Sequence, residues 1–283
     1  MRFDWSKMGR TPPAALVEAR NLAHHAAQWP AKAARANLSA APDESHSAFT
    51  WDAAHAALVS QVLRAKGGGV RVGIRIARLE LIVTSGDSML DAFQLDGRTD
   101  AGVGAWIDSK LQALGLKPAG RVKLPYALPD HPAGSGPHEI GKLGRELGEL
   151  SRWFGGSAEA LDEFAAKLAG LRPGPGPVLC WPHHFDIATL VRLDAGTGES
   201  ARSVGVGVSP GDEFYAQPYV YVSPWPRFEG SLPELPPPGH WHTEGFFGAV
   251  ATGEEILAMK DRGRAFFAFI AGAFEIGRAR LGV

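Results

Sequence analysis

Residues 70–76, with the sequence VRVGIRI, alternate between apolar side chains and arginine or glycine. Successive side chains of an extended chain point to opposite faces, so the apolar members of this stretch share one face. They are Val70, Val72, Ile74 and Ile76. The alternation predicts a β-strand with one buried face, and the glycines at 67–69 predict a turn before it.

Apolar side chains recur at helical spacing in five other segments, which are residues 11–38, 101–116, 138–154, 158–171 and 264–281. Pro30 is expected to kink or divide the first of these helices, because proline lacks the backbone N–H that an interior turn needs. Ser157 is expected to cap the fourth helix. In the last segment the apolar face consists of Phe266, Phe269, Ile270, Ala273, Phe274 and Gly277.

The sequence RPGPGP at 172–177 is the strongest breakpoint in the chain. Strands are predicted after it at 178–190, 202–208, 216–223 and 242–250. The order of elements lacks the regular βαβ rhythm of a parallel sheet, so we predict an α+β fold with mostly antiparallel sheet flanked by long helices. The expected organisation is one globular unit with two similar α+β halves, residues 1–130 and 178–283, joined by a helical connector at 131–177.

Composition excludes several classes of protein. There are 29 Lys and Arg against 30 Asp and Glu, with no basic stripe, so a nucleic-acid partner is not predicted. The single cysteine, Cys180, excludes an intrachain disulfide and a cysteine-based zinc site. The sequence contains no signal peptide and no apolar run of about 18 residues, so we expect a cytoplasmic protein without a membrane partner. The oligomeric state cannot be read from the sequence.

Two short segments contain four of the ten histidines. They are VLCWPHHFDIATL at 178–190 and GHWHTEG at 239–245. If both segments are strands, histidine and carboxylate side chains lie together on one face of each strand. Their nitrogen and oxygen atoms can then coordinate a metal ion. The candidate metal ligands are His184, Asp186, His240, His242 and Glu244. Two histidines with a carboxylate suit non-haem iron, and three such ligands with an open position suit zinc.

The candidate pocket residues around these ligands are His46, His183, Asp212, Tyr219 and Trp225. Tyrosine and tryptophan line many ligand pockets, although aromatic alternation is also common in strands. Cys180 lies in an apolar stretch, which favours an inert buried thiol over a catalytic one. Asp212 and Glu213 follow a Ser-Pro-Gly turn, which favours an exposed acidic turn.

Several stretches resemble domain-of-unknown-function family 5996, a group of bacterial proteins. They are NLSAAPDESHSAFTWDAAHAALVSQV, LQALGLKPAGRVKLPYALPD, PVLCWPHHFDIATL, VGVGVSPGDEFYAQPYVYVSPWP and HTEGFFGAV, within a match from about residue 12 to the end. The family-like positions are Phe185, Asp186, Pro210, Gly211, Asp212, Tyr219, Pro224 and Glu244, and His46 lies in a histidine-bearing loop that the resemblance places before a strand. The sequence departs from the family pattern at His183 and His184. The resemblance implies a single globular unit and no particular activity.

Two functions follow from the candidate residues. In the first, the chain is a metal-dependent enzyme that acts on a small molecule, with zinc, iron or manganese lowering the pKa of bound water toward about 7. In the second, it is a non-catalytic ligand-binding or scaffold protein, and its histidines form a hydrogen-bonded polar network.

Overall fold

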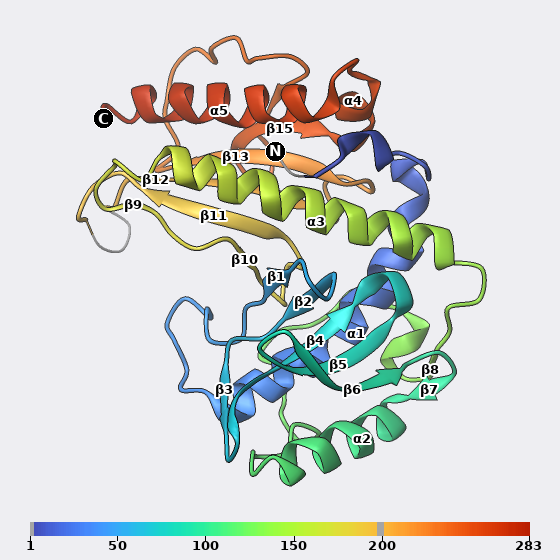
Figure 1. The fold of residues 1–283 in the computed structure, drawn as a ribbon. Coiled ribbons are helices and arrows are strands. Elements are labelled where there is room, and N and C mark those ends of the chain that lie inside the picture. The colour runs from blue at the N-terminus through green and yellow to red at the C-terminus, as the bar shows by residue number, and fades with distance from the viewer. Residues whose placement is uncertain (1–2, 197–200) are drawn as a thin grey trace. The chain divides into compact units, whose positions relative to one another are not determined.

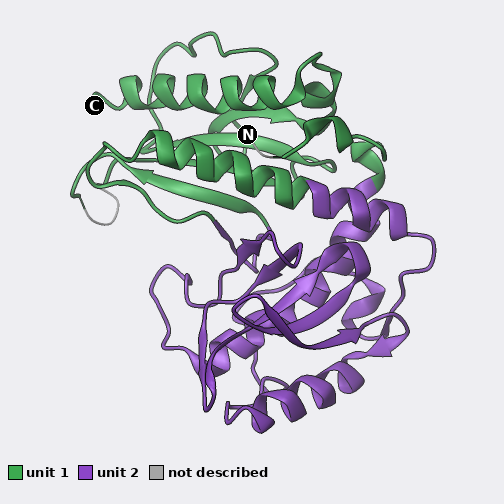
Figure 2. Ribbon diagram, in the orientation of Figure 1, with its two compact units in different colours: residues 1–15, 153–178, 186–283 green, residues 16–152, 179–185 purple. Residues whose placement is uncertain are grey.

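A computed structural model describes residues 3–196 and 201–283 of the chain (Figure 1). These residues form two compact units (Figure 2). Unit 1 comprises residues 1–15, 153–178 and 186–283, and unit 2 comprises residues 16–152 and 179–185. Each unit combines helices with an antiparallel sheet, so the predicted α+β fold class is confirmed.

The two units interleave along the chain. The predicted half 1–130 contains one of the two larger sheets, and the predicted half 178–283 contains the other except for the two-residue strand at 174–175. Residues 1–15 and 179–185, however, each belong to the unit formed mainly by the other half. The predicted connector 131–177 is divided between the units at residue 153, inside helix α3 (Gly144–Lys167).

The sheet of unit 2 follows the strand order β1-β2-β4-β5-β6, with β3 paired to β4, and its pairings are antiparallel. Its strands are β1 (Thr50–Asp52), β2 (Ala57–Val59), β3 (Leu63–Ala65), β4 (Gly68–Arg75), β5 (Glu80–Ser85) and β6 (Ser88–Gln94). Strand β4 confirms the strand predicted from the alternating segment, and Val70, Val72 and Ile74 are buried. The strand ends before Ile76, which begins the 3₁₀ turn η3 (Ile76–Arg78).

Helix α1 (Val17–Asn37) contacts β4 and follows the 3₁₀ turn η2 (Pro13–Leu16). Pro30 lies inside α1, so it does not divide the helix. The alanines that flank it, Ala26, Ala27, Ala31 and Ala33, are completely buried. Packing of this small-residue face offsets the backbone hydrogen bond that proline removes.

The remaining elements of unit 2 are helix α2 (Asp100–Ala113), the 3₁₀ turn η4 (Pro132–Gly134), strands β7 (Arg98–Thr99), β8 (Pro137–His138) and β10 (Leu179–Cys180), and the first part of α3. Helix α3 continues through Ser157, so the two helices predicted at 138–154 and 158–171 are one (Figure 2). Ser157 is completely buried in the middle of that helix and does not cap it.

The sheet of unit 1 contains the strand order β11-β12-β13-β15-β14, with β9 paired to β11, and these pairings are antiparallel. Its strands are β9 (Gly174–Pro175), β11 (Ile187–Arg192), β12 (Ser203–Ser209), β13 (Tyr219–Trp225), β14 (His240–His242) and β15 (Gly248–Thr252). The unit also contains η1 (Trp5–Lys7), α4 (Gly253–Ala258) and α5 (Arg262–Arg280).

Helix α5 packs on β12 and β13 and covers one face of this sheet (Figure 1). All six residues of its predicted apolar face are buried. On the strands, the side chains beneath α5 are buried valines, which are Val204, Val206, Val220 and Val222. Because side chains alternate along a strand, Ser209, Tyr219 and Tyr221 lie on the opposite face.

Two of the predicted C-terminal strands are interrupted. The segment 178–190 contains β10, a turn at 182–184 and then β11. Pro182 has no N–H for a sheet, and Phe185 has a φ of 59°, in the left-handed region that ends an extended chain. The segment 242–250 is likewise divided between β14 and β15, at Gly245 with a φ of 83°.

None of the described helices combines the length and the apolar character that a membrane span requires.

Candidate functional site

The turn at 182–184 changes the expected arrangement of the first histidine segment. His183 and His184 do not alternate on a strand with Asp186, so the predicted shared face of His184 and Asp186 is wrong. His183 and His184 belong to unit 2, whereas Asp186 belongs to unit 1. The candidate residues therefore fall into two groups, one in each unit.

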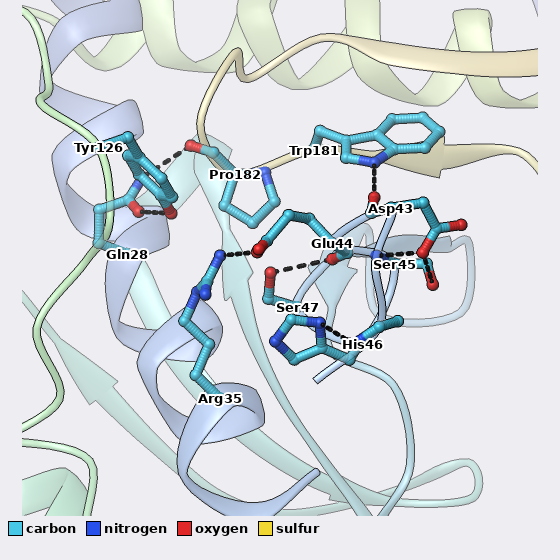
Figure 3. Close-up of polar contacts among 11 residues, drawn as sticks. Gln28, Arg35, Asp43, Glu44, Ser45, His46, Ser47, Tyr126, Trp181 and Pro182 are labelled. Carbon is cyan, nitrogen blue, oxygen red and sulfur yellow. Dashed lines mark hydrogen bonds and ion pairs between the residues drawn. The ribbon is translucent and has the colours of Figure 1, made fainter. Parts of the chain in front are cut away.

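Two side chains of α1 hold the turn in unit 2. The carbonyl of Pro182 accepts hydrogen bonds from His24 Nε2 at 2.8 Å and from Gln28 Nε2 at 3.0 Å. Tyr126 donates its hydroxyl proton to Gln28 Oε1 at 2.8 Å (Figure 3). The His24 ring also stacks on Phe185, with 4.9 Å between the ring centroids. This network fixes the left-handed backbone at Phe185.

His46 holds the loop in which it lies. Its Nδ1 accepts the backbone N–H of Ala41 at 3.2 Å, and its side chain is buried. In the same loop Glu44 forms an ion pair with Arg35, and Asp43 accepts a hydrogen bond from Trp181 Nε1 through its carbonyl (Figure 3). The geometry therefore gives the predicted pocket residue His46 a structural role.

His183 lies between two other rings, with 5.6 Å to the ring centroid of Tyr126 and 4.3 Å to that of His184. Burial, with a smaller contribution from His184, lowers the pKa of His183 to about 4. Its Nδ1 is enclosed and makes no hydrogen bond to the part of the chain that the structure describes. His183 is thus neutral at pH 7.

The second histidine segment forms β14 in unit 1, and its two imidazoles meet at one hydroxyl group. Tyr215 Oη lies 3.1 Å from His240 Nε2 and 2.9 Å from His242 Nδ1. At the far side of His240, Nδ1 lies 3.7 Å from Glu255 Oε1. We call His240, His242, Tyr215 and Glu255 the His–Tyr cluster. The predicted common face of His240 and His242 is confirmed.

The hydrogen bonds of the His–Tyr cluster have a defined direction. His242 Nε2 bonds to the backbone carbonyl of Glu244, so this nitrogen carries the proton and Nδ1 of neutral His242 is an acceptor. Tyr215 then donates its hydroxyl proton to His242 Nδ1, and its oxygen accepts the Nε2–H of His240. In the neutral form of His240 the remaining nitrogen, Nδ1, carries the lone pair, and it lies 3.7 Å from Glu255 Oε1.

Neighbouring elements hold each member of the cluster. Glu255 belongs to a capping box at the start of α4, where its Oε2 accepts the backbone N–H and the hydroxyl of Thr252. Phe246 stacks on the His242 ring with 4.0 Å between centroids, and Phe214 contacts the same ring edge-on. Burial, followed by Glu255 and Asp212, raises the pKa of Tyr215, so its hydroxyl remains a donor at neutral pH.

Asp212 positions Tyr215 and is itself saturated with hydrogen bonds. Its Oδ1 accepts the backbone N–H groups of Phe214 and Tyr215, at 2.9 and 3.2 Å. Its Oδ2 accepts the hydroxyl of Tyr219 at 2.5 Å and that of Ser209 at 3.3 Å. Burial and this bond to Asp212 raise the pKa of Tyr219 above its usual value. Asp212 therefore holds Tyr215 in place, and Tyr219 in turn holds the Asp212 carboxylate.

Asp186 accepts a hydrogen bond from the Tyr221 hydroxyl. Tyr221 reaches it by crossing Gly207, because a Cβ built at Gly207 would lie 2.6 Å from the Tyr221 ring and from Ala188. Glycine at this position is therefore required for the Tyr221–Asp186 contact.

Gly207→Ala is expected to lower the free energy of unfolding by about 1–3 kcal/mol, because the added methyl group forces Tyr221 or β11 to move. Gly205→Ala, two residues away on β12, is the matched control, since its Cβ would meet only the Ser223 carbonyl at 3.8 Å. Urea denaturation of both variants measures the difference. Equal losses of stability in the two variants would contradict the close approach of Tyr221.

The predicted metal ligands do not form a preassembled metal site in the described residues. These residues contain no group of three or more His, Cys, Asp or Glu side chains arranged to hold a metal ion. Both ring nitrogens of His242 are engaged, and Glu244 contributes its backbone carbonyl to that arrangement. Trp225, a predicted pocket residue, lies at the end of β13 and is half exposed.

Sequence reasoning missed Tyr215 and Glu255. Tyr215 lies three residues after Asp212, in a stretch that favours an exposed turn, and the Asp212 carboxylate organises that turn. The Thr252–Glu255 spacing is the signature of a capping box, which could have placed Glu255 at a helix start. The pairing of β14 with β15, which leads into α4, was not visible in the sequence.

No protein-family model, curated protein or solved structure matches the chain. The resemblance to domain-of-unknown-function family 5996 thus stays a prediction.

Proposed function

We propose that unit 1 binds a small polar molecule at the His–Tyr cluster and exchanges a proton with it. The observation that carries this proposal is the sharing of the Tyr215 hydroxyl between two imidazoles, with Glu255 beside the outer nitrogen of His240. The His240 and Glu255 side chains are 41% and 39% exposed, so a ligand can approach the end of the network that has a free lone pair.

The chemistry of the cluster suits a general base. A proton accepted by His240 Nδ1 produces an imidazolium ion next to the Glu255 carboxylate, and that opposite charge stabilises it. The other ring nitrogen remains a donor to Tyr215, so protonation does not disturb the rest of the network. Phe214 and Phe246 supply apolar walls beside these polar groups, a combination typical of small-molecule sites.

A divalent metal ion is the second candidate occupant, and a metal-dependent enzyme would then follow. The observation in its favour is the convergence of two imidazole nitrogens on one oxygen atom, since histidine nitrogen is a common ligand of zinc, iron and manganese. His240, His242 and the Tyr215 oxygen would hold the ion, which would lower the pKa of a bound water. Such an ion would replace the hydrogen bonds of Tyr215.

Tyr215→Phe is expected to weaken ligand binding about ten-fold or more, because it removes the hydroxyl group that joins the two histidines. The measurement is an NMR titration of the imidazole signals of His240 and His242 with carboxylic acids, amides, alcohols and inorganic phosphate in turn. Binding of one class should shift both imidazole signals in the native protein. Tyr126→Phe, in unit 2, is the matched control and should bind like the native protein.

Metal analysis distinguishes a bound small molecule from a bound metal ion at the His–Tyr cluster. The protein, purified without an affinity tag, is incubated with zinc, iron and manganese, dialysed and analysed for metal content. A stoichiometric ion that is lost in His242→Ala would replace our proposal by the metal-dependent one. Small-molecule shifts without bound metal support the proposal, and the absence of both would refute it.

A further inference from the structure

A pocket of about 590 Å³ lies in unit 1, beside the loop that joins β13 to β14. It is lined by Arg227, Phe228, Glu229, Gly230, Leu232, Thr243 and Phe247, and we call it the Arg227 pocket. Its volume is in the range of small-molecule sites. Alternation along β14 places Trp241 on the opposite face from His240 and His242. Trp241 contacts the rings of this pocket, so the pocket is distinct from the His–Tyr cluster.

The floor of the pocket is aromatic and rigidly supported. Phe228 and Phe247 meet edge-to-face, with 5.0 Å between centroids and an angle of 86°. Behind them the Trp241 ring stacks on Phe247 at 5.4 Å, and its Nε1 donates a hydrogen bond to the Pro233 carbonyl at 2.7 Å. The two phenylalanines are each 9% exposed, so their remaining open surface is small. A planar ring can contact the open edges of these two phenylalanines in the edge-to-face geometry that aromatic pairs favour.

The cationic group of the pocket is Arg227. Its guanidinium carbon lies 4.7 Å from the ring centroid of Phe247, and the side chain is exposed. Arg227 forms no ion pair with any residue in the described ranges. A second arginine, Arg280, lies over Phe228 but donates a hydrogen bond to the Ser231 carbonyl. Arg227 therefore keeps its planar N–H groups available for an anion.

We propose that the Arg227 pocket binds a planar aromatic carboxylate. The ring of the ligand lies against the exposed edges of Phe228 and Phe247, because Trp241, Arg227 and Arg280 already cover their faces. Its carboxylate accepts hydrogen bonds from the Arg227 guanidinium, whose fork-like geometry matches a carboxylate. Thr243, which carries a hydroxyl group, also lines the pocket. Glu229 also lines the pocket, and its negative charge weakens the binding of any anion, most of all that of ligands with a second anionic group.

Benzoate, benzamide and benzylamine test the proposal, because they share a ring and differ in charge. Benzoate is expected to bind with a dissociation constant on the order of 1 mM, and the other two more weakly. The measurement is NMR titration that follows the backbone amides of Gly230 and Thr243 and the indole N–H of Trp241. Shifts at these three positions locate the ligand in the Arg227 pocket.

Arg227→Gln is expected to weaken benzoate binding about ten-fold or more and to leave benzamide binding unchanged. Glu229→Gln should leave benzoate binding equal or tighter. The matched control is Arg264→Gln, at an exposed arginine of α5 outside the pocket, which should bind like the native protein. Equal binding of benzoate and benzamide, tighter binding of benzylamine, or no shift at the three positions would each overturn the proposal.

Discussion

Acidification from pH 6.5 to pH 4 is expected to lower the free energy of unfolding by about 3 kcal/mol through His24 alone. His24 is 5% exposed, and burial lowers its pKa from 6.5 to about 4. Its Nε2–H donates to the Pro182 carbonyl, so a second proton would have to enter at Nδ1 of this largely buried ring. The folded protein therefore keeps His24 neutral at a pH where the unfolded chain binds a proton.

The sign follows from this difference in bound protons. Between pH 6.5 and pH 4 the unfolded state binds more protons than the folded state, so stability decreases as the pH falls through that interval. Above pH 6.5 the contribution of His24 to the free energy of unfolding is fully present. Below pH 4 this contribution does not change further. Burial also lowers the pKa values of His25 and His183, and both act in the same direction. Carboxylates with lowered pKa values, such as Asp194, lose their contribution to the free energy of unfolding only below about pH 3.8.

Urea denaturation at a series of pH values tests this prediction, with His24→Phe as the informative variant. Phenylalanine preserves the stacking on Phe185, and the Pro182 carbonyl keeps its hydrogen bond from Gln28. The variant should be less stable at pH 7 by about 1 kcal/mol but should lose much less stability on acidification. Tyr126→Phe removes a hydrogen bond to Gln28 beside the same turn but no group that titrates between pH 4 and 6.5, so it should keep the native slope. A native slope in His24→Phe would show that another group is responsible.

The sequence predicts those helices and strands that bury a single face, because burial of one face sets the spacing of their apolar residues. Strand β4 and helix α5 are examples, because each buries a single face and its apolar residues repeat at the matching period. Pro30 and Ser157 show where such local rules fail. Both lie inside long helices, because burial of the surrounding helix face outweighs the local preference of one residue.

The candidate site depends on contacts that no local pattern contains. The sequence identified His240 and His242 because an i, i+2 pair on a strand shares a face. Their partner Tyr215 lies 25 and 27 residues away, and its position is set by a turn around Asp212. The turn at Pro182, in contrast, places His184 outside a strand, so His184 does not share a face with Asp186 as predicted. A proline and one left-handed residue were sufficient to end the strand there.

Asp212→Ala is expected to lower the free energy of unfolding by about 3 kcal/mol and to weaken ligand binding at the His–Tyr cluster. The substitution leaves the hydroxyl of Tyr219, a residue only 5% exposed, without its acceptor. It also releases the backbone N–H groups of Phe214 and Tyr215. Tyr215 should then lose its fixed place between the two histidines, so the imidazole NMR signals of His240 and His242 should both shift.

A double-mutant cycle with Tyr219→Phe separates the two effects of Asp212. Phenylalanine at 219 removes the buried hydroxyl, so the cost of Asp212→Ala should be smaller in that background by about 1 kcal/mol or more. The imidazole signals should still respond to Asp212→Ala there, because the bonds to the 214–215 backbone are lost in both backgrounds. Asp212→Asn keeps an oxygen for those backbone groups and should preserve the signals. If Asp212→Ala changed stability but left both imidazole signals unmoved, Asp212 would support the fold without positioning Tyr215.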